Sequence, residues 1–237
     1  MMTSTSNTPI FTVVGAPGTG TTAITALLAQ AYAQRGRHVL AVNLDRQNNL
    51  TEAMSADPAL DRLAADERIV HTEMGVDVMP NAAAAGAVKG GCTFRDVLRR
   101  QTVYDLILVD GGTREFFHDQ WAVQAADRLL LVVSGRTEGQ ELTSLRFLGQ
   151  KLEELRQDSQ TCQEAGVILN FCEPDSTPGR NAVYTLGRDE ALSQLPLLGT
   201  VPEDNLIRRA LESGKSFFQL APESPAAQAV QTIRKQL

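Results

Sequence analysis

The segment that most constrains the fold is residues 11–45, FTVVGAPGTGTTAITALLAQAYAQRGRHVLAVNLD. An apolar run at residues 11–14 is followed by a glycine-rich turn and then by a second, longer apolar stretch. In that stretch the apolar residues fall at helical spacing, at Ile24, Leu27, Leu28 and Ala31. Another apolar run follows at residues 38–44. This order predicts a strand, a helix and a second strand, which together form a βαβ unit of a parallel sheet.

The turn after the first predicted strand has the spacing of a phosphate-binding loop. Gly15, Gly20 and Thr22 fit the pattern G-x-x-x-x-G-K-[ST], but Thr21 stands where the pattern has lysine. Backbone N–H groups of such a turn and of the helix N-terminus bind phosphate, and the Thr22 hydroxyl suits Mg²⁺. The residues predicted to bind nucleotide in this loop are Gly15, Ala16, Pro17, Gly18, Thr19, Gly20, Thr21 and Thr22.

The missing lysine predicts that binding and hydrolysis are affected differently. Backbone donors and the helix dipole can still hold ATP or ADP. With Thr21 in the lysine position, no loop side chain neutralises the charge that develops on a transferring phosphoryl group. We therefore expect hydrolysis to be slow or absent, and a weak ATPase if the protein is an enzyme. The alternative is that the glycines only form a tight turn of a Rossmann-like domain.

Two aspartates at predicted strand ends extend the candidate site. Residues 104–110, YDLILVD, have the apolar character of a buried central strand, and Asp110 at its end suits a Mg²⁺ ligand in the Walker B role. Asp45 ends the strand before it, where a carboxylate binds Mg²⁺ through water or orients an attacking water. Capping of the helix predicted at residues 50–54 explains Asp45 equally well.

Composition limits the class of protein. The chain has 237 residues, of which 43% are hydrophobic and 21% charged, as expected for one α/β domain with a sizeable core. With a net charge of −6, the surface as a whole is not expected to bind nucleic acid. Three cysteines without paired spacing predict neither a disulfide framework nor a zinc site, and favour the cytoplasm. Residues 1–9 are polar and predict a disordered leader before a domain at residues 10–237.

The rest of the chain alternates between strand and helix patterns. Strands are predicted at residues 75–80, 128–133, 167–170 and 197–202, and helices at 56–66, 94–100, 138–157, 205–213 and from Ser224 onward. Residues 81–91, NAAAAGAVKGG, predict a loop. The alternation predicts an α/β fold, a single domain with a doubly wound, mostly parallel sheet and flanking helices.

The motifs in this order resemble the ParA/MinD family of P-loop ATPases. The segments concerned are the glycine-rich loop, VNLDRQNNLT, YDLILVD, VILN, GTVPED and the ending ALESGKSFFQLAPESPAAQAV. The resemblance implies ATP-bridged homodimers that position or assemble cellular cargo together with protein partners. It implies that Thr22 and Asp110 bind Mg²⁺ and that Asp45 is the catalytic switch I aspartate. It further implies that Asn170 and Pro202 border the adenine.

The chain departs from the family pattern in its charges. Ala16 and Thr21 replace the two P-loop lysines, and Asn43 replaces the first aspartate of the usual D-x-D. A lysine-less G-x-G-T-T loop is similar to BcsQ-type cellulose-secretion members, and CpaE/TadZ-type pilus-assembly members have a comparably altered loop. Gly18-Thr19-Gly20 differs from the G-V-G usual in both. The resemblance implies a positioning or assembly factor of a partition, secretion, pilus or cellulose apparatus.

Other functions remain open at this point. Loss of both lysines also fits a nucleotide-free pseudo-ATPase scaffold, and a dethiobiotin-synthetase-like ligase is a less favoured interpretation. DNA binding would need a basic patch, for which the candidates are Arg208, Arg209, Lys215, Arg234 and Lys235. Acidic residues among them favour a solvated helix face instead. No membrane insertion is predicted, since the last helix lacks an apolar and basic face.

Overall fold

The computed structural model describes residues 8–44, 49–55, 69–81, 84, 87–88, 92–111, 116–136, 153, 162, 164–173, 175–189 and 193–237. At residues 116–120 and 164–165 it describes the backbone alone. All structural statements below refer to these residues.

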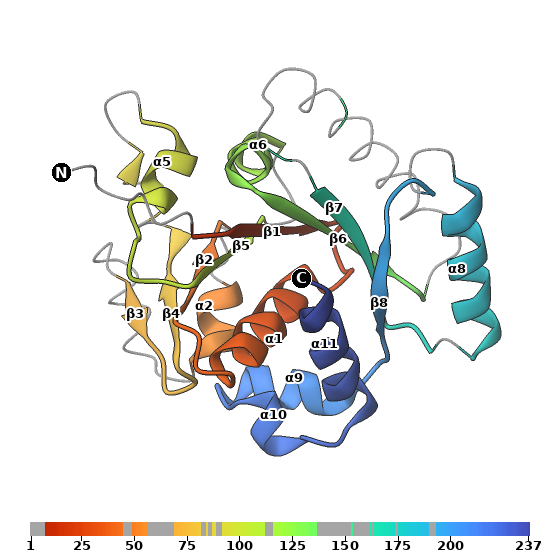
Figure 1. Ribbon diagram of the computed structural model, residues 1–237. Coiled ribbons are helices and arrows are strands. Elements are labelled where there is room, and N and C mark those ends of the chain that lie inside the picture. Colours follow the sequence, from red (N-terminus) through yellow and green to blue (C-terminus); the bar gives the residue numbers. More distant parts are fainter. Residues whose placement is uncertain are drawn as a thin grey trace.

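The framework is an 8-stranded sheet in the order β3-β4-β2-β5-β1-β6-β7-β8 (Figure 1). The strands are β1 Ile10–Gly15, β2 Val39–Asn43, β3 Val70–His71, β4 Val76–Met79, β5 Leu106–Asp110, β6 Arg128–Ser134, β7 Glu164–Asn170 and β8 Leu197–Val201. β3 pairs antiparallel with β4, and every other pair is parallel. The mostly parallel sheet predicted from the sequence is confirmed.

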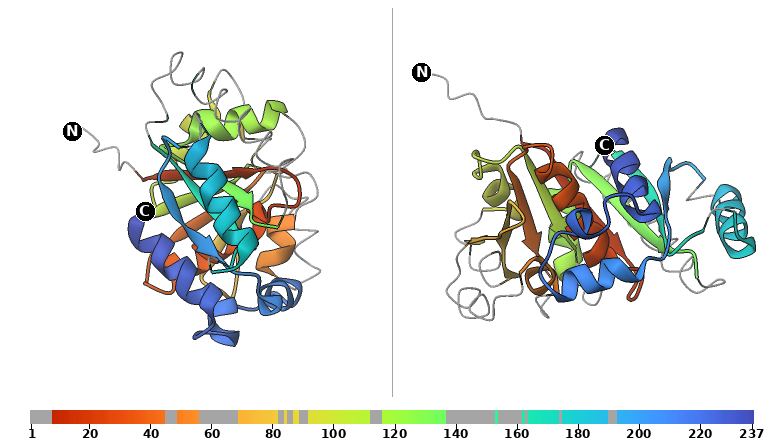
Figure 2. Two further views of the ribbon diagram at one scale, coloured as in Figure 1. Left: turned by 90° about the vertical axis from the view of Figure 1, so that its right-hand side faces the viewer. Right: turned by 90° about the horizontal axis from the view of Figure 1, so that it is seen from below.

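Helices cover both faces of the sheet, which makes the fold doubly wound. They are α1 Thr21–Ala33, α2 Asn49–Met54, α5 Phe94–Arg99, α6 Phe116–Ala125, α8 Thr177–Arg188, α9 Asn205–Glu212, α10 Phe217–Leu220 and α11 Pro225–Gln236. In Figure 1, α5 and α6 lie above the sheet, whereas α1, α2, α9, α10 and α11 lie below it. The left view of Figure 2 shows the sheet between these layers.

The apolar run of β5 illustrates why the central strands read as continuous hydrophobic segments. Leu106 and Leu108 belong to the core under α1 and α11, while Ile107 and Val109 belong to the core under α5 and α6. Since successive side chains of a strand point to opposite faces, both sets must be apolar when both faces are covered.

One predicted loop contains helix. Asn81, Ala84 and Ala87 are helical, although residues 81–91 were expected to form a loop. Ala84 is buried, and its N–H donates to the carbonyl of Pro80 across 3.0 Å. Alanine has the highest helix propensity, and its small side chain fits against the core beneath α5, so the alanine run should have indicated helix. The helix predicted at residues 56–66 lies outside the described residues, as does that at 138–157 apart from Glu153, which is helical.

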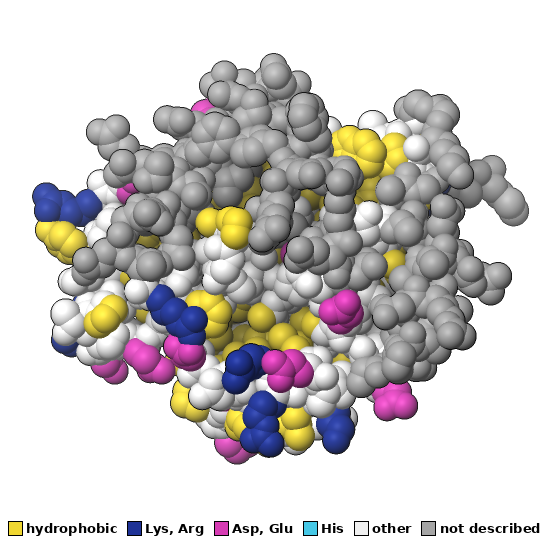
Figure 3. Space-filling model, turned by 180° about the vertical axis from the view of Figure 1, so that it is seen from behind, with side chains coloured by type: hydrophobic (Ala, Val, Ile, Leu, Met, Phe, Trp, Pro, Cys, Tyr) yellow, Lys and Arg dark blue, Asp and Glu magenta, His cyan; other side chains and the backbone are white. Residues whose placement is uncertain are grey.

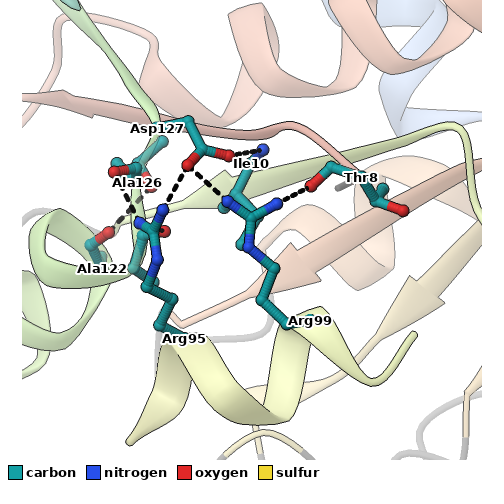
Figure 4. Close-up of polar contacts among 9 residues, drawn as sticks. Thr8, Ile10, Arg95, Arg99, Ala122, Ala126 and Asp127 are labelled. Atoms are coloured by element: carbon teal, nitrogen blue, oxygen red, sulfur yellow. Dashed lines mark hydrogen bonds and ion pairs between the residues drawn. The ribbon is translucent and has the colours of Figure 1, made fainter. Parts of the chain in front are cut away.

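Two arginines of α5 form a hydrogen-bond network that links the start of β1 to the start of β6 (Figure 4). Arg99 and Arg95 both donate to Asp127, with 2.6 Å between Arg99 Nη2 and Asp127 Oδ1. Asp127 also accepts from the Ile10 N–H at 2.9 Å, and Arg99 donates to the Thr8 carbonyl. Arg99 lies in the last turn of α5, where a cation also complements the helix dipole, and it is bonded inside this network. Among the described residues, no helix is long and apolar enough to cross a membrane.

Candidate functional site

The strand register brings the predicted site residues to one edge of the sheet. Asp110 at the end of β5 is level with Asn43 of β2 and with Val13 of β1. On the other side of β1, Asn170 at the end of β7 is level with Ser134 of β6. Because the strands are parallel, their carboxyl ends and the loops that follow them share this edge, where open α/β sheets bind ligands.

The glycine-rich loop after β1 is closed tightly on itself. Gly18 and Gly20 have φ angles of 84° and 86°, a left-handed conformation that other residues adopt only at a cost. A Cβ atom at Gly15 would lie 2.5 Å from both Thr19 Oγ1 and the Val132 carbonyl oxygen, so only glycine fits there. The Thr19 hydroxyl donates to the Ala16 carbonyl at 2.8 Å and holds the turn together.

The loop leads directly into the N-terminus of α1. Gly20 is the N-cap and has no side chain to bond the first N–H groups of the helix. The first turn of α1, which is described throughout, contains no acidic residue. The N–H groups and the positive end of the helix dipole are therefore available to an anion, and this arrangement fits a phosphate group.

Thr21, in the lysine position, is packed inside the loop. The residue is only 2% exposed, and its Cγ2 would lie 2.9 Å from a Cβ on Gly15. Its carbonyl accepts from the Thr25 hydroxyl at 2.9 Å. The position thus contributes a small, buried side chain and no charge to the loop.

Thr22 and Asp110 meet beside the loop. The Thr22 hydroxyl donates to Asp110 Oδ2 at 2.7 Å, and Asp110 is 0% exposed. Magnesium prefers oxygen ligands and is commonly held by one or two carboxylates together with substrate phosphates and water. This oxygen pair fits such an ion. The described residues contain no group of three or more His, Cys, Asp or Glu that could hold a metal by themselves, and Asp45 lies outside them.

Asn170 contacts the loop from the opposite side. Its Nδ2 donates to the Thr19 carbonyl at 2.8 Å, and a Cβ atom at Gly20 would lie 2.3 Å from that nitrogen. Pro202 is buried directly after β8, the strand next to β7. The structure thus places Asn170 against the loop and Pro202 at the neighbouring strand end. Burial raises the pKa of the nearby Cys172 thiol, with a smaller contribution from Glu173.

Sequence reasoning missed a cluster at the same edge. Phe171 has a φ of 53°, and the guanidinium carbon of Arg136 lies 4.1 Å from the centre of its ring. Arg136 also forms a two-point ion pair with Glu203, with 3.0 Å between Nε and Oε2. The available signal was position, because Phe171 directly follows β7, and Arg136 and Glu203 each come two residues after a strand.

Two of the candidate basic residues, Arg208 and Arg234, contact other side chains. Arg208 Nε lies 3.9 Å from Glu212 Oε1, and the Arg234 guanidinium lies over the ring of Tyr32 at 5.8 Å. In Figure 3, basic and acidic side chains are intermixed on the lower part of the face shown. This arrangement agrees with the prediction of a solvated surface.

Comparisons with known proteins identify the class. Residues 10–217 match the family model of the CobQ/CobB/MinD/ParA nucleotide binding domain. The match spans most of the chain, so the protein belongs to this family, and the predicted resemblance to ParA/MinD proteins is confirmed.

Individual known proteins are similar over most of this chain. An uncharacterized ATP-binding protein of Methanocaldococcus jannaschii is 26% identical over 94% of this chain and 84% of its own. The septum site-determining protein MinD of Pyrococcus horikoshii, solved with Mg-ADP, is 25% identical, with a TM-score of 0.71 over 96% of this chain and 95% of that chain. The cell division ATPase MinD of Pyrococcus furiosus, 24% identical, shares the fold with a TM-score of 0.72 over 97% of this chain and 98% of that one.

Proposed function

We propose that the protein binds ATP and ADP with Mg²⁺ at the loop after β1 and works as a positioning or assembly factor. In this proposal Gly15 to Thr22 hold the phosphates, Thr22 and Asp110 hold Mg²⁺, and Asn170 and Pro202 border the base. Asp45 orients the attacking water. Mg-ADP in the MinD of Pyrococcus horikoshii and the ATP-binding relative of Methanocaldococcus jannaschii support the choice of ligand.

The contact between Thr22 and Asp110 is the observation that carries the proposal. A hydroxyl from the first turn of α1 and a buried carboxylate from β5 lie 2.7 Å apart beside the glycine-rich loop. A bound magnesium ion would supply charge neutralisation to the phosphates and would take the Thr22 and Asp110 oxygens as ligands. A loop that only turned the chain would not require this pair.

Slow or absent hydrolysis is part of the proposal. Thr21 is buried in the loop and has no charge, so it cannot stabilise charge on a transferring phosphoryl group. An arginine contact of that kind contributes several orders of magnitude to the rates of related phosphoryl transfers. A protein of this kind would change state on binding nucleotide and would return slowly, which suits an assembly factor of a partition, secretion, pilus or cellulose apparatus.

The family assignment and the surface support further parts of the proposal. We infer a homodimer, a protein partner in such an apparatus and a cytoplasmic location, with residues 10–237 as the nucleotide-binding domain. Thr8, which the sequence assigned to a leader, is buried, and its hydroxyl donates to the Tyr104 carbonyl at 3.0 Å. DNA is not favoured as a partner, because Arg208 lies beside Glu212 and Arg234 packs on Tyr32.

A nucleotide-free scaffold is the second candidate function. The burial of Thr21 favours it, because a small uncharged side chain fills the loop where a lysine would bind phosphate. The two candidates differ in whether the purified protein binds nucleotide at all.

Isothermal titration of the purified chain with ATP and ADP, with and without Mg²⁺, separates them. Light scattering on the same samples reports the mass. Magnesium-dependent binding, with a shift to the mass of a dimer, is the expected result. Absence of binding at millimolar nucleotide would overturn the proposal and would leave the scaffold function.

A further inference from the structure

The ends of β6, β7 and β8 are joined to one another beside the loop. The Gly135 N–H after β6 donates to the Asn170 carbonyl at 2.7 Å, and the Cys172 N–H after β7 donates to the Val201 carbonyl at 3.0 Å. The ion pair between Arg136 and Glu203 then links the loop after β6 to the loop after β8. The three strand ends therefore form one connected surface.

Phe171 lies at the centre of this surface and against the phosphate-binding loop. Its Cζ would be 3.3 Å from a Cβ atom on Gly20, so the ring edge lies directly over the start of α1. Its φ of 53° is unfavourable for a residue other than glycine, and such strained conformations cluster at functional sites. Asn170, one residue earlier, holds this corner in place through its bond to the Thr19 carbonyl.

The guanidinium of Arg136 lies over the ring of Phe171. The guanidinium carbon lies 4.1 Å from the ring centre, and Nε and Nη2 both donate to the Glu203 carboxylate. Both constraints fix the plane of the group. Half of the Arg136 side chain, 50%, remains exposed. The planar, positively charged guanidinium is thus exposed at the edge of the site, and the Phe171 ring lies between it and Gly20.

We propose that the guanidinium of Arg136, fixed by Phe171 and Glu203, stacks on the base of the bound nucleotide. This inference rests on the proposed function, because it assigns a residue to the nucleoside end of the same site. Arginine guanidinium planes and aromatic rings stack on nucleobases through the π-face that every base possesses. Stacking on the base adds binding free energy, which offsets the contacts that the lysine-less loop does not make with the phosphates.

A structural role for Arg136 predicts a different outcome. An exposed ion pair contributes little to stability, and the Arg136 and Glu203 side chains are 50% and 51% exposed. If the ion pair only linked the two loops, its loss would change the affinity for a ligand with a base and for a ligand without one by the same factor. That difference is what the experiment measures.

The test compares Arg136→Ala with the unchanged chain in titrations with Mg-ATP, Mg-ADP and magnesium tripolyphosphate. Base stacking predicts that the variant binds ATP and ADP about 5- to 30-fold more weakly. Binding of tripolyphosphate, which has no base, should change less than about twofold because the stack is not involved. Arg136→Lys keeps the charge but not the planar face, and should lose affinity for ATP in the same direction. Arg188→Ala is the matched control, because Arg188 is an exposed arginine stacked on Tyr184 in α8.

Each outcome decides the proposal. An equal loss for ATP and tripolyphosphate would show that Arg136 acts only by its charge, and an unchanged ATP affinity would show that it does not contact the base. Either result overturns the inference and leaves the proposed function intact. If the unchanged chain binds no nucleotide, the proposed function fails and the inference fails with it. If tripolyphosphate binds too weakly to measure, the ratio of ATP to UTP affinity decides. A lower ratio in Arg136→Ala supports stacking, and an unchanged ratio overturns it.

Discussion

Thr22 Oγ1 donates to Asp110 Oδ2 across 2.7 Å, so the first turn of α1 and the end of β5 meet at a single point. The two residues come from different βα units, and the parallel register of β1 and β5 sets their distance. This contact makes the magnesium dependence of nucleotide binding a direct test of the site.

Asp110→Asn is expected to remove most of that magnesium dependence. The amide keeps the shape of the carboxylate but has no negative charge for the ion, so affinity for Mg-ATP should fall about 10-fold or more. Affinity for ATP without magnesium should change little. Titration calorimetry with and without Mg²⁺ measures both. Asp105→Asn, at the opposite edge of the sheet beside Arg37, is the matched control. Full magnesium dependence in Asp110→Asn would contradict the assignment.

Thr21→Lys should strengthen ATP binding. The replacement restores a charged donor next to the phosphates, and hydrogen bonds to charged groups contribute about 1.5 to 3 kcal/mol, which corresponds to about 10-fold or more in affinity. Thr21→Met adds a side chain of similar length without the charge and serves as the control. Equal affinities of the two variants for Mg-ATP would show that the phosphates do not lie near position 21.

Gly20→Ala and Gly18→Ala form a matched pair for the loop. Both glycines have left-handed φ angles, but a Cβ at Gly18 meets no atom of the described residues within 4 Å, whereas one at Gly20 would lie 2.3 Å from Asn170 Nδ2. Gly18→Ala should therefore cost about 1 to 2 kcal/mol of unfolding free energy from backbone strain. Gly20→Ala should cost about 3 kcal/mol or more, because it also displaces the side chain of Asn170. Urea unfolding monitored by circular dichroism measures the difference, and equal costs would rule out the close packing of Asn170 on the loop.

Asp127→Asn should destabilise the fold without altering the nucleotide site. Asp127 accepts from Arg95, Arg99 and the Ile10 N–H, so loss of its charge leaves two partly buried guanidinium groups without their counterion. We expect a loss of about 2 kcal/mol in unfolding free energy. Glu212→Gln, which removes the exposed partner of Arg208, should cost less than about 0.5 kcal/mol. The same urea titrations compare the two variants, and costs of similar size would contradict the role of Asp127.

Tyr104→Phe is expected to reduce the loss of stability in alkaline solution. Burial, followed by the hydrogen bond that Tyr104 donates to Asp77, raises the pKa of this phenol above its ordinary value of 10.0. A raised pKa in the folded state stabilises the fold below the unfolded pKa, and this contribution is lost as pH rises from about 10 toward the folded pKa. Unfolding midpoints measured from about pH 8 to about pH 11 should therefore fall less steeply in the variant.

A second tyrosine also contributes to the loss of stability in alkaline solution. Burial also raises the pKa of Tyr32, so part of the slope will remain in Tyr104→Phe. Parallel curves for the variant and the unchanged chain would show that Tyr104 and Asp77 do not interact in solution.

Strong local patterns explain what the sequence could predict. The apolar run of β5 ends in Asp110 because the strand is buried on both faces and delivers one carboxylate to the edge. The helix before the chain end was also visible, since Ser224 accepts from the Ala227 N–H as an N-cap and Pro225 follows it. These signals depend on neighbouring residues alone, so they survive without knowledge of the fold.

The features that were missed depend on tertiary context. α8 buries only Gly179 and Leu186, so its sequence has no wide apolar stripe to mark it as a helix. β3 has two residues and exists because Val70 pairs with Val78 of β4. The stack of Arg136 on Phe171 joins loops that follow different strands, and no local spacing indicates such a contact.

The place of β1 between β5 and β6 affects how the chain is made. β1 leaves the ribosome before both of its partners, which end at Asp110 and Ser134, much later in the chain. At about 5 to 20 residues per second, several seconds of synthesis separate β1 from the strands that flank it. During that interval the apolar side chains of β1 and α1 lack the central strands they pack against in the folded protein, and exposed apolar surface of this kind promotes aggregation. A nascent chain that stops before β5 would hold the phosphate-binding loop without the strands that shape it.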